Sequence, residues 1–196
     1  MPEIKPRYEF RIWADSLAPL RAQLSALGEA REAKSAETYL ISHVTDRSNV
    51  KVRADLMDIK VLVAEDRGLE QWKPILKAGF PLAATVIGGQ VFPALELAAP
   101  TLTKSDFTFD EFLQQVVRPN PQIAIAEVSK TRYQFTIGAC AAEYSVITIN
   151  KVPRDTVAVE STDADAVLSL VDQLGIQQPN MNYIREIRRI LGWQTA

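Results

Sequence analysis

The stretch "NVKVRADLMDIKVLV" (49–63) places three basic side chains within two runs of apolar, mostly β-branched residues. Lys51 and Arg53 lie two positions apart in the first run, and Lys60 lies in the second. Residues two apart in a β-strand point to the same face of a sheet. The stretch therefore predicts a hairpin that turns around residues 54–57 and directs cations to one face.

Two other segments show the same alternation of apolar and charged side chains. Arg11 lies on the polar face of "RYEFRIW" (7–13), and Lys130 and Arg132 share a face of "EVSKTRYQFT" (127–136). These segments also read as half-buried strands. The candidate cationic set on strand faces is Arg11, Lys51, Arg53, Lys60, Lys130 and Arg132.

The residues alone leave two interpretations of these cations open. In an open sheet the charged faces would meet water, and the basic residues would only form a solvated surface. In a closed or strongly curled sheet they would converge on one lumen. Converging buried cations need anions, supplied either by internal carboxylates or by a ligand. Arginine together with lysine suits a polyphosphate, because arginine binds oxygens as a fork and lysine as a point charge.

The composition limits the function classes. The chain has 196 residues, 47% of them hydrophobic, and a formal net charge of −2, as expected for a soluble globular protein. A nucleic-acid-binding protein usually shows a net basic face or a high pI, so we expect no nucleic-acid partner. The cationic site must therefore be local.

The pattern predicts an α+β fold with an antiparallel sheet, because many strands are joined by short turns and the helices do not alternate regularly with them. Strands are expected at 7–13, 37–44, 49–53, 58–63, 122–139, 143–150 and 155–160. Helices are expected at 14–28, 68–79, 108–117, 161–175 and 180–193. Asp15 or Ser16 is the expected N-cap of the first helix and Asn180 that of the last. No assignment is made for 80–102.

Several kinds of site are excluded. There is no glycine-rich phosphate loop of the Walker or dinucleotide type. Cys140 and His43 are the only residues of their kinds, so a histidine-based or cysteine-based metal cluster is not available. We expect a buried thiol at Cys140 and a structural role for His43. No run approaches the length of a membrane span, and we expect a cytoplasmic protein with no membrane partner.

The order of the motifs resembles the CYTH-like group of the triphosphate tunnel metalloenzyme superfamily. The segments that carry the resemblance are "YEFRIW", "VKVR" with "DIKV", "SKTRY", "CAAEYSV", "VAVESTDADAVLSLVDQLG" and "NYIREI". They extend over roughly residues 7–193 in the order that the family shows. The resemblance implies one domain over 1–196, folded as an eight-stranded antiparallel β tunnel flanked by helices.

The resemblance also implies a function for the tunnel. Known members hydrolyse inorganic triphosphate, nucleoside triphosphates or thiamine triphosphate, or cyclise ATP. Their tunnel carboxylates hold Mg²⁺ or Mn²⁺, which neutralises phosphate charge. The implied phosphate-binding residues are Arg11, Lys51, Arg53, Lys60, Lys130 and Arg132. The implied metal ligands are Glu9, Glu143 and Glu160, with Asp58 as a further candidate.

The chain departs from the family pattern at the metal positions. Arg11 stands where the first motif has its second glutamate, and Ala158 stands at the first glutamate of the later pair. Three hypotheses follow: a divergent metal-dependent phosphohydrolase, a non-catalytic binder in which Arg11 takes over the role of the metal, or an interaction module whose cations pair internally. The expected ligand is tripolyphosphate or a nucleoside triphosphate. A homodimer stays open, since an exposed apolar outer face would favour one.

Overall fold

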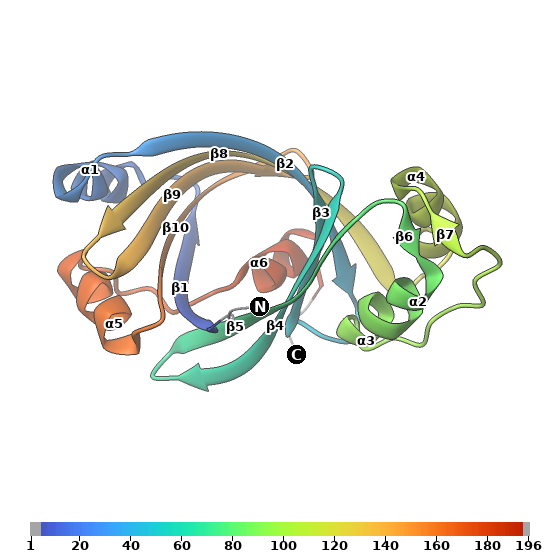
Figure 1. Ribbon diagram of the computed structural model, residues 1–196. Helices are drawn as coiled ribbons and strands as arrows, with labels where there is room; N and C mark the ends of the chain where they lie inside the picture. The colour runs from blue at the N-terminus through green and yellow to red at the C-terminus, as the bar shows by residue number, and fades with distance from the viewer. Residues whose placement is uncertain (1–4, 194–196) are drawn as a thin grey trace.

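The computed structural model describes residues 5–193 and shows a closed antiparallel barrel of eight strands (Figure 1). The strand order around the barrel is β1-β10-β9-β8-β2-β3-β4-β5. The bounds are β1 Arg7–Ala14, β2 Arg31–Ser42, β3 Ser48–Arg53, β4 Leu56–Asp66, β5 Leu69–Gly79, β8 Ile123–Ile137, β9 Cys140–Ile149 and β10 Val152–Ser161. The predicted α+β fold, an eight-stranded antiparallel tunnel flanked by helices, is confirmed.

The hairpin of 49–63 is formed as predicted. β3 and β4 pair with Lys51 opposite Asp58 and Asn49 opposite Lys60. The turn consists of Ala54 and Asp55, which have φ values of 48° and 57°. Two consecutive positive φ angles are typical of the tight hairpin turns whose twist matches that of the flanking strands. The turn thereby fixes the register that sends Lys51, Arg53 and Lys60 to the inner face.

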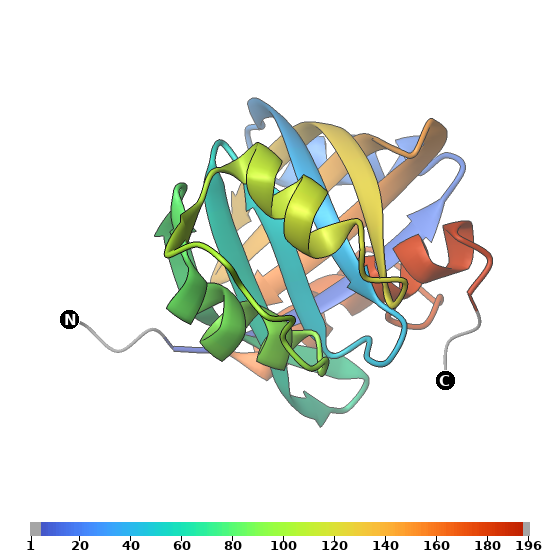
Figure 2. The same ribbon diagram turned by 90° about the vertical axis from the view of Figure 1, so that its right-hand side faces the viewer.

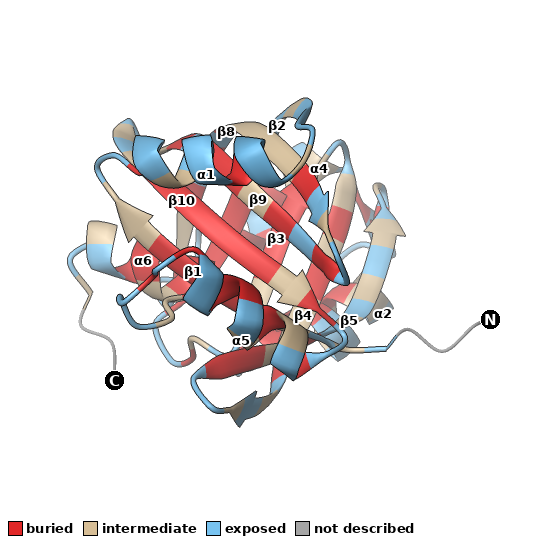
Figure 3. Cartoon of the chain, turned by 90° about the vertical axis from the view of Figure 1, so that its left-hand side faces the viewer, coloured by how far each residue is buried: buried red, intermediate tan, exposed pale blue. Residues whose placement is uncertain are grey.

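Helices cover two parts of the outer surface. α1 (Ala18–Leu27) and α5 (Ala164–Gln173) lie on the outside of β1, β9 and β10 (Figure 3). Apolar side chains of these strands pack against the two helices. α2 (Ala84–Val86), α3 (Phe92–Ala94), α4 (Phe109–Glu111) and two π-helical segments (Ile87–Val91 and Phe112–Val117) cover β2, β3 and β4 (Figure 2). The short strands β6 (Leu82–Ala83) and β7 (Asp106–Phe107) pair with each other. Because apolar residues face these helices, their charged neighbours face the lumen.

α6 (Tyr183–Ile190) lies against the inner face of the barrel and is seen through the ring of strands in Figure 1. Its residues Tyr183, Ile184 and Ile187 are buried among apolar side chains of β2, β8 and β9. The Tyr183 ring stacks on Tyr39 with centroids 5.6 Å apart. One end of the barrel interior is therefore an apolar core, and the charged lining is confined to the other end.

Polar contacts fix the start of α6. Asn182 is its N-cap, and the Asn182 side chain accepts a hydrogen bond from the Arg185 backbone N–H. The Asn182 amide also donates to Glu70 Oε1 at 2.9 Å, and Arg185 Nη1 donates to the same oxygen at 2.9 Å. Asn180, the expected cap, instead accepts a hydrogen bond from the Arg11 backbone N–H. This expectation was wrong by two residues, and the contact ties the segment before α6 to β1.

Segment 68–79 is a strand and not the helix that the sequence pattern predicted. β5 closes the barrel by pairing with both β4 and β1. Pro74 lies opposite Lys60, where the register between β4 and β5 shifts, and such an irregularity tolerates a residue without a backbone N–H. Closure of the barrel therefore overrides a local pattern that is ambiguous between helix and strand.

Two further boundaries differ from the sequence expectation. β2 begins at Arg31, six residues before the expected start, and its added residues pair with β8. The N-cap of α1 is Leu17 and not Asp15 or Ser16. The Leu17 backbone N–H donates to Asp155 Oδ2 at 2.8 Å, so a carboxylate from β10 caps this helix from a distance. In the part of the chain that the structure describes, no helix is both long and apolar enough to span a membrane.

Replacement of Ile187 by alanine tests how strongly the packing of α6 inside the barrel stabilises the fold. The Ile187 side chain is fully buried, so Ile187→Ala should lower the free energy of unfolding by about 2–5 kcal/mol. Ile75→Ala is the matched control, because Ile75 lies on β5 and is 43% exposed. This substitution should lower the free energy of unfolding by less than about 1 kcal/mol. Urea unfolding followed by circular dichroism measures both. Equal losses in the two variants would contradict a structural role for α6.

Candidate functional site

The charged end of the barrel interior encloses a cavity of about 530 Å³. All six basic residues predicted to bind phosphate line it, as do the three predicted metal ligands Glu9, Glu143 and Glu160. Among the described residues, the charged lining comprises seven basic and five acidic side chains. The cavity therefore carries an excess of positive charge, although the whole chain has a formal net charge of −2. The additional basic residue is Arg31, and the additional acidic residues are Glu37 and Asp58.

Glu37 on β2 is the counter-ion of three of these cations. Its Oε2 lies 2.8 Å from Lys130 Nζ and 3.3 Å from Lys51 Nζ. Its Oε1 lies 3.5 Å from Arg53 Nη1. The Tyr39 hydroxyl donates a hydrogen bond to Glu37 Oε2 at 2.9 Å. The glutamate is only 2% exposed, so its charge is stabilised by these neighbours and not by water.

Burial and charge act in opposite directions on this cluster. Burial alone would raise the pKa of Glu37, but the charges of Lys51 and Lys130 outweigh burial and hold that pKa well below its usual value. Burial lowers the pKa of Lys51 to about 8, and it lowers that of Lys130 to about 8 although Glu37 opposes this shift. Both lysines are therefore mainly charged at neutral pH and lose their protons in mildly alkaline solution.

Sequence reasoning missed Glu37, although a signal for it was present. The expected strand 37–44 began with this residue, and alternation places Glu37 on the same face as Tyr39 and Ile41. Both of those side chains are fully buried inside the barrel. A carboxylate that alternates with two inward-facing residues must itself face the lumen, where cations and hydrogen-bond donors are its favourable neighbours.

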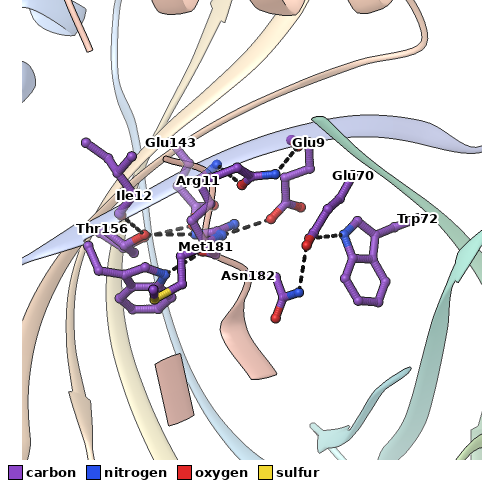
Figure 4. Close-up of polar contacts among 12 residues, drawn as sticks. Glu9, Arg11, Ile12, Glu70, Trp72, Glu143, Thr156, Met181 and Asn182 are labelled. Carbon is purple, nitrogen blue, oxygen red and sulfur yellow. Dashed lines mark hydrogen bonds and ion pairs between the residues drawn. The ribbon is translucent and has the colours of Figure 1, made fainter. Parts of the chain in front are cut away.

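Arg11 on β1 makes a second set of contacts in the cavity (Figure 4). Its Nε donates to Glu9 Oε1 at 2.9 Å, and its Nη1 donates to Thr156 Oγ1 at 3.2 Å. Its guanidinium carbon lies 4.5 Å from the centroid of the Tyr183 ring, within the range of a cation–π interaction. Burial alone would lower the pKa of Arg11, but the negative charges of Glu9 and Glu143 and the other nearby acidic groups together outweigh burial and raise that pKa.

The remaining predicted metal ligands are also held by arginines. Arg132 binds Glu143 Oε2 through both Nε, at 2.7 Å, and Nη2. Glu160 lies nearer to solvent, with its side chain 30% exposed, and pairs with Arg7 Nη1 at 2.8 Å. Asp58 Oδ2 lies 3.8 Å from Arg53 Nη2. Every carboxylate that the family resemblance suggested as a metal ligand therefore has a basic partner within the protein.

These residues do not fit a divalent metal ion in the arrangement seen here. Within residues 5–193, no group of three or more histidine, cysteine, aspartate or glutamate side chains is placed to hold a metal. Any ion near Glu9 would also approach the buried guanidinium of Arg11. Two like unit charges 4 Å apart repel each other by about 4 kcal/mol at an effective dielectric constant of 20. The metal role of Glu9, Glu143 and Glu160 stays a prediction that this geometry does not favour.

Three polar groups in the cavity lack protein partners. Lys60 makes no ion pair or hydrogen bond within residues 5–193, although its charge lowers the pKa of nearby Glu9, whose burial acts in the opposite direction. Among the described side chains, the buried Tyr183 hydroxyl and Asn49 Oδ1 have no hydrogen-bond partner. Buried polar atoms without partners are unusual in native proteins. Here all three residues line one cavity, so a ligand or water in it would supply what they lack.

The two single residues, His43 and Cys140, lie outside the cavity. The His43 ring stacks on Trp193 with centroids 3.4 Å apart. Cys140 is buried, and burial raises the pKa of its thiol. Both observations agree with the structural roles expected from the sequence.

No family model and no curated protein sequence matches this chain. Solved structures do resemble it. A putative adenylyl cyclase from Hippeastrum, whose title reports a dominant triphosphatase activity, is 10% identical with a TM-score of 0.54, over 96% of this chain and 97% of that one. A conserved hypothetical protein from Pyrococcus furiosus is 14% identical with a TM-score of 0.52, over 92% and 98%. A putative adenylate cyclase from Bacillus halodurans is 12% identical with a TM-score of 0.50, over 93% and 98%.

Identities this low establish the fold and nothing more. The chain has the eight-stranded tunnel fold of CYTH-like proteins, as the order of its motifs predicted. The alignments extend over nearly the whole of each neighbouring chain, so the likeness concerns the complete barrel and its flanking helices.

Removal of the Glu37 charge tests its role as the shared counter-ion. Glu37→Gln should lower the free energy of unfolding at pH 7 by about 3–5 kcal/mol, because Lys51 and Lys130 would be left buried without their anion. Glu65→Gln is the matched control, since the Glu65–Arg47 pair is exposed and should contribute less than about 1 kcal/mol.

The same variant should show a characteristic pH dependence. The pKa of each lysine is about 8 in the folded protein and 10.5 ordinarily, so the unfolded chain binds more protons between these values. Raising the pH through this window removes the charges of Lys51 and Lys130 and with them the free-energy cost of burying those charges. This cost is larger in Glu37→Gln, which lacks the anion, so the variant gains more stability than wild type. The stability difference between Glu37→Gln and wild type should therefore shrink from pH 7 to pH 10. A constant difference in urea unfolding experiments would contradict the assignment.

Proposed function

We propose that the barrel cavity binds a small anion of the triphosphate class, either inorganic tripolyphosphate or the triphosphate group of a nucleotide or ester. The observation that carries the proposal is the excess of basic over acidic side chains in the barrel cavity of a chain with a net charge of −2. Such an excess is costly in a confined space unless an anion enters it.

The chemistry of the lining supports phosphate rather than another anion. Arginine forks and lysine ammonium groups from β1, β3, β4 and β8 surround the cavity, so a chain of phosphoryl groups could be contacted from several sides. Among residues 5–193, neither Lys60 nor the Tyr183 hydroxyl, both potential donors to a phosphate, has a hydrogen-bond or ion-pair partner. The Hippeastrum neighbour, whose title reports triphosphatase activity, has the same fold and adds support for a triphosphate ligand.

The proposal concerns binding rather than hydrolysis. A metal-dependent phosphohydrolase needs carboxylates that are available to the ion, and here Glu9 and Glu143 are engaged by Arg11 and Arg132. An adenylate cyclase activity finds no further support in the described side chains. The cytoplasmic location expected from the sequence stays a prediction, and the question of a homodimer stays open.

One observation favours a second candidate, an interaction module whose cations need no ligand. Glu37 approaches Lys51, Arg53 and Lys130 within 3.5 Å. Glu9 and Glu143 pair with Arg11 and Arg132, so five of the six predicted phosphate-binding residues already have an internal anion. On this hypothesis tripolyphosphate would not bind, and the ion pairs of the lumen would serve only to stabilise and specify the fold of the barrel. The two candidates differ in a single measurable property, the affinity of the purified protein for tripolyphosphate.

Calorimetric titration with tripolyphosphate at pH 7 tests the proposal. Wild type should bind with one-to-one stoichiometry. Lys60→Gln should raise the Kd at least about tenfold, because a hydrogen bond to a charged group contributes about 1.5–3 kcal/mol. Lys73→Gln is the matched control: Lys73 is an exposed lysine on the neighbouring strand β5, outside the cavity lining, and its loss should change the Kd less than twofold.

Two results would count against the proposal. Absence of wild-type binding would favour the interaction module. Equal effects of Lys60→Gln and Lys73→Gln would place the ligand outside the barrel. A thermal melt of each variant, compared with wild type, checks that the barrel is intact.

A further inference from the structure

We infer that the cavity binds its polyphosphate ligand without a divalent cation, and that the guanidinium of Arg11 supplies the positive charge among the cavity carboxylates. This inference rests on the proposed function, since it concerns how the same ligand is held. The inference also goes beyond the proposed function, because it states that the ligand is the free anion and not its complex with a metal ion.

The strand register places Arg11 among the carboxylates. Arg11 lies opposite Ala158 on β10, and Ala158 lies opposite Glu143 on β9. Glu9, two residues before Arg11 on the same face of β1, lies opposite Glu160. The small side chain of Ala158 leaves space across β10, and the charges of Glu9 and Glu143 both act on Arg11. The guanidinium thus lies between the acidic side chains of Glu9 on β1 and Glu143 on β9.

Arg11 is also held firmly. Its side chain is only 8% exposed, and it is fixed by Glu9, by the Thr156 hydroxyl and by the face of the Tyr183 ring. The Thr156 hydroxyl is itself oriented, since it donates to the Ile12 carbonyl at 2.8 Å. A cation that is already ordered loses little side-chain entropy when a ligand arrives.

The guanidinium keeps donors for a ligand. An arginine side chain has five N–H groups, and the contacts with Glu9 and Thr156 use two of them. Within the described residues, the remaining three N–H groups have no hydrogen-bond partner. Arg11 lines the cavity, so these donors are available to phosphate oxygens there. The ion pair with Glu9 therefore positions the guanidinium without exhausting it.

The carboxylates are less available to a metal ion than Arg11 is to a phosphate. Glu143 accepts hydrogen bonds from Arg132 and, at 2.8 Å, from the Ser145 hydroxyl. A metal ion would have to displace an arginine from Glu143 or approach the fixed charge of Arg11 at Glu9. Glu9 and Glu143 are balanced by Arg11 and Arg132, so this part of the cavity offers a metal ion no net negative charge, while Arg11 still presents N–H donors to an anion.

Calorimetry with tripolyphosphate, performed once in EDTA and once with excess Mg²⁺, tests the inference on the full chain. Binding should occur in EDTA, and Mg²⁺ should not strengthen it. Arg11→Gln should raise the Kd in EDTA at least tenfold. Arg21→Gln is the matched control. Arg21 also lies over a tyrosine ring, 4.0 Å from the centroid of Tyr133, but it is outside the cavity lining. The Kd of this variant for tripolyphosphate should stay within twofold of the wild-type value.

The outcomes separate this inference from the proposed function. Binding that requires Mg²⁺ would overturn the inference and leave the proposed function standing. Absence of binding in both conditions would overturn the proposed function itself. Binding in EDTA that Arg11→Gln leaves unchanged would overturn the role of Arg11. If Arg11→Gln does not fold, Arg11→Lys replaces it. Lysine keeps the positive charge but lacks the paired N–H donors of the guanidinium, so the Kd should rise at least threefold. An unchanged Kd would overturn the role of Arg11.

A direct measurement of metal binding gives an independent readout. Electron paramagnetic resonance of Mn²⁺ mixed with the ligand-free protein should show the full signal of the free ion for wild type. The double variant Arg11→Glu with Ala158→Glu would replace the cation by carboxylates, and it should reduce the free-ion signal. A strong loss of signal with wild type would show that the carboxylates do take up a divalent ion, contrary to the inference.

Discussion

Closure of the sheet is the constraint on which the rest of the structure depends. Once eight strands form a ring, alternate side chains of every strand must share one interior, and charged groups there lose most of their water. Each one then needs an opposite charge within reach. The ion pairs of Glu37, Glu9 and Glu143 are the outcome of this requirement. An excess of two basic side chains over acidic ones remains in the cavity lining, and the proposed binding of an anion rests on this excess.

Much of the fold could be predicted because alternation is a local signal. The turn between Arg53 and Leu56 and the common face of Lys130 and Arg132 follow from spacing alone. β5 could not be predicted in the same way, because its pairing with β1 and β4 is non-local. The order of motifs compensated for this gap, since it predicted a closed tunnel before any strand pairing was known.

The candidate site shows a similar division between what is local and what is not. Alternation places the six cations on the polar faces of their strands, and closure of the barrel directs all of them into the cavity. Their partners were not, because an ion pair such as Arg132 with Glu143 depends on the register between two strands. Glu37 was the main omission. It belongs to the same alternating pattern as Tyr39, but no motif drew attention to a carboxylate among cations.

The position of α6 has a consequence for the shape of what can enter the barrel. Tyr183, Ile184 and Ile187 fill one end of the interior together with apolar side chains of the surrounding strands. The space is therefore a blind pocket with its charged lining toward the open end, rather than a passage with two exits. A linear anion longer than this pocket could insert only its terminus and would have to leave by the way it came. A pocket of this shape would admit the end of a linear anion and exclude its middle, without contacting the rest of that ligand.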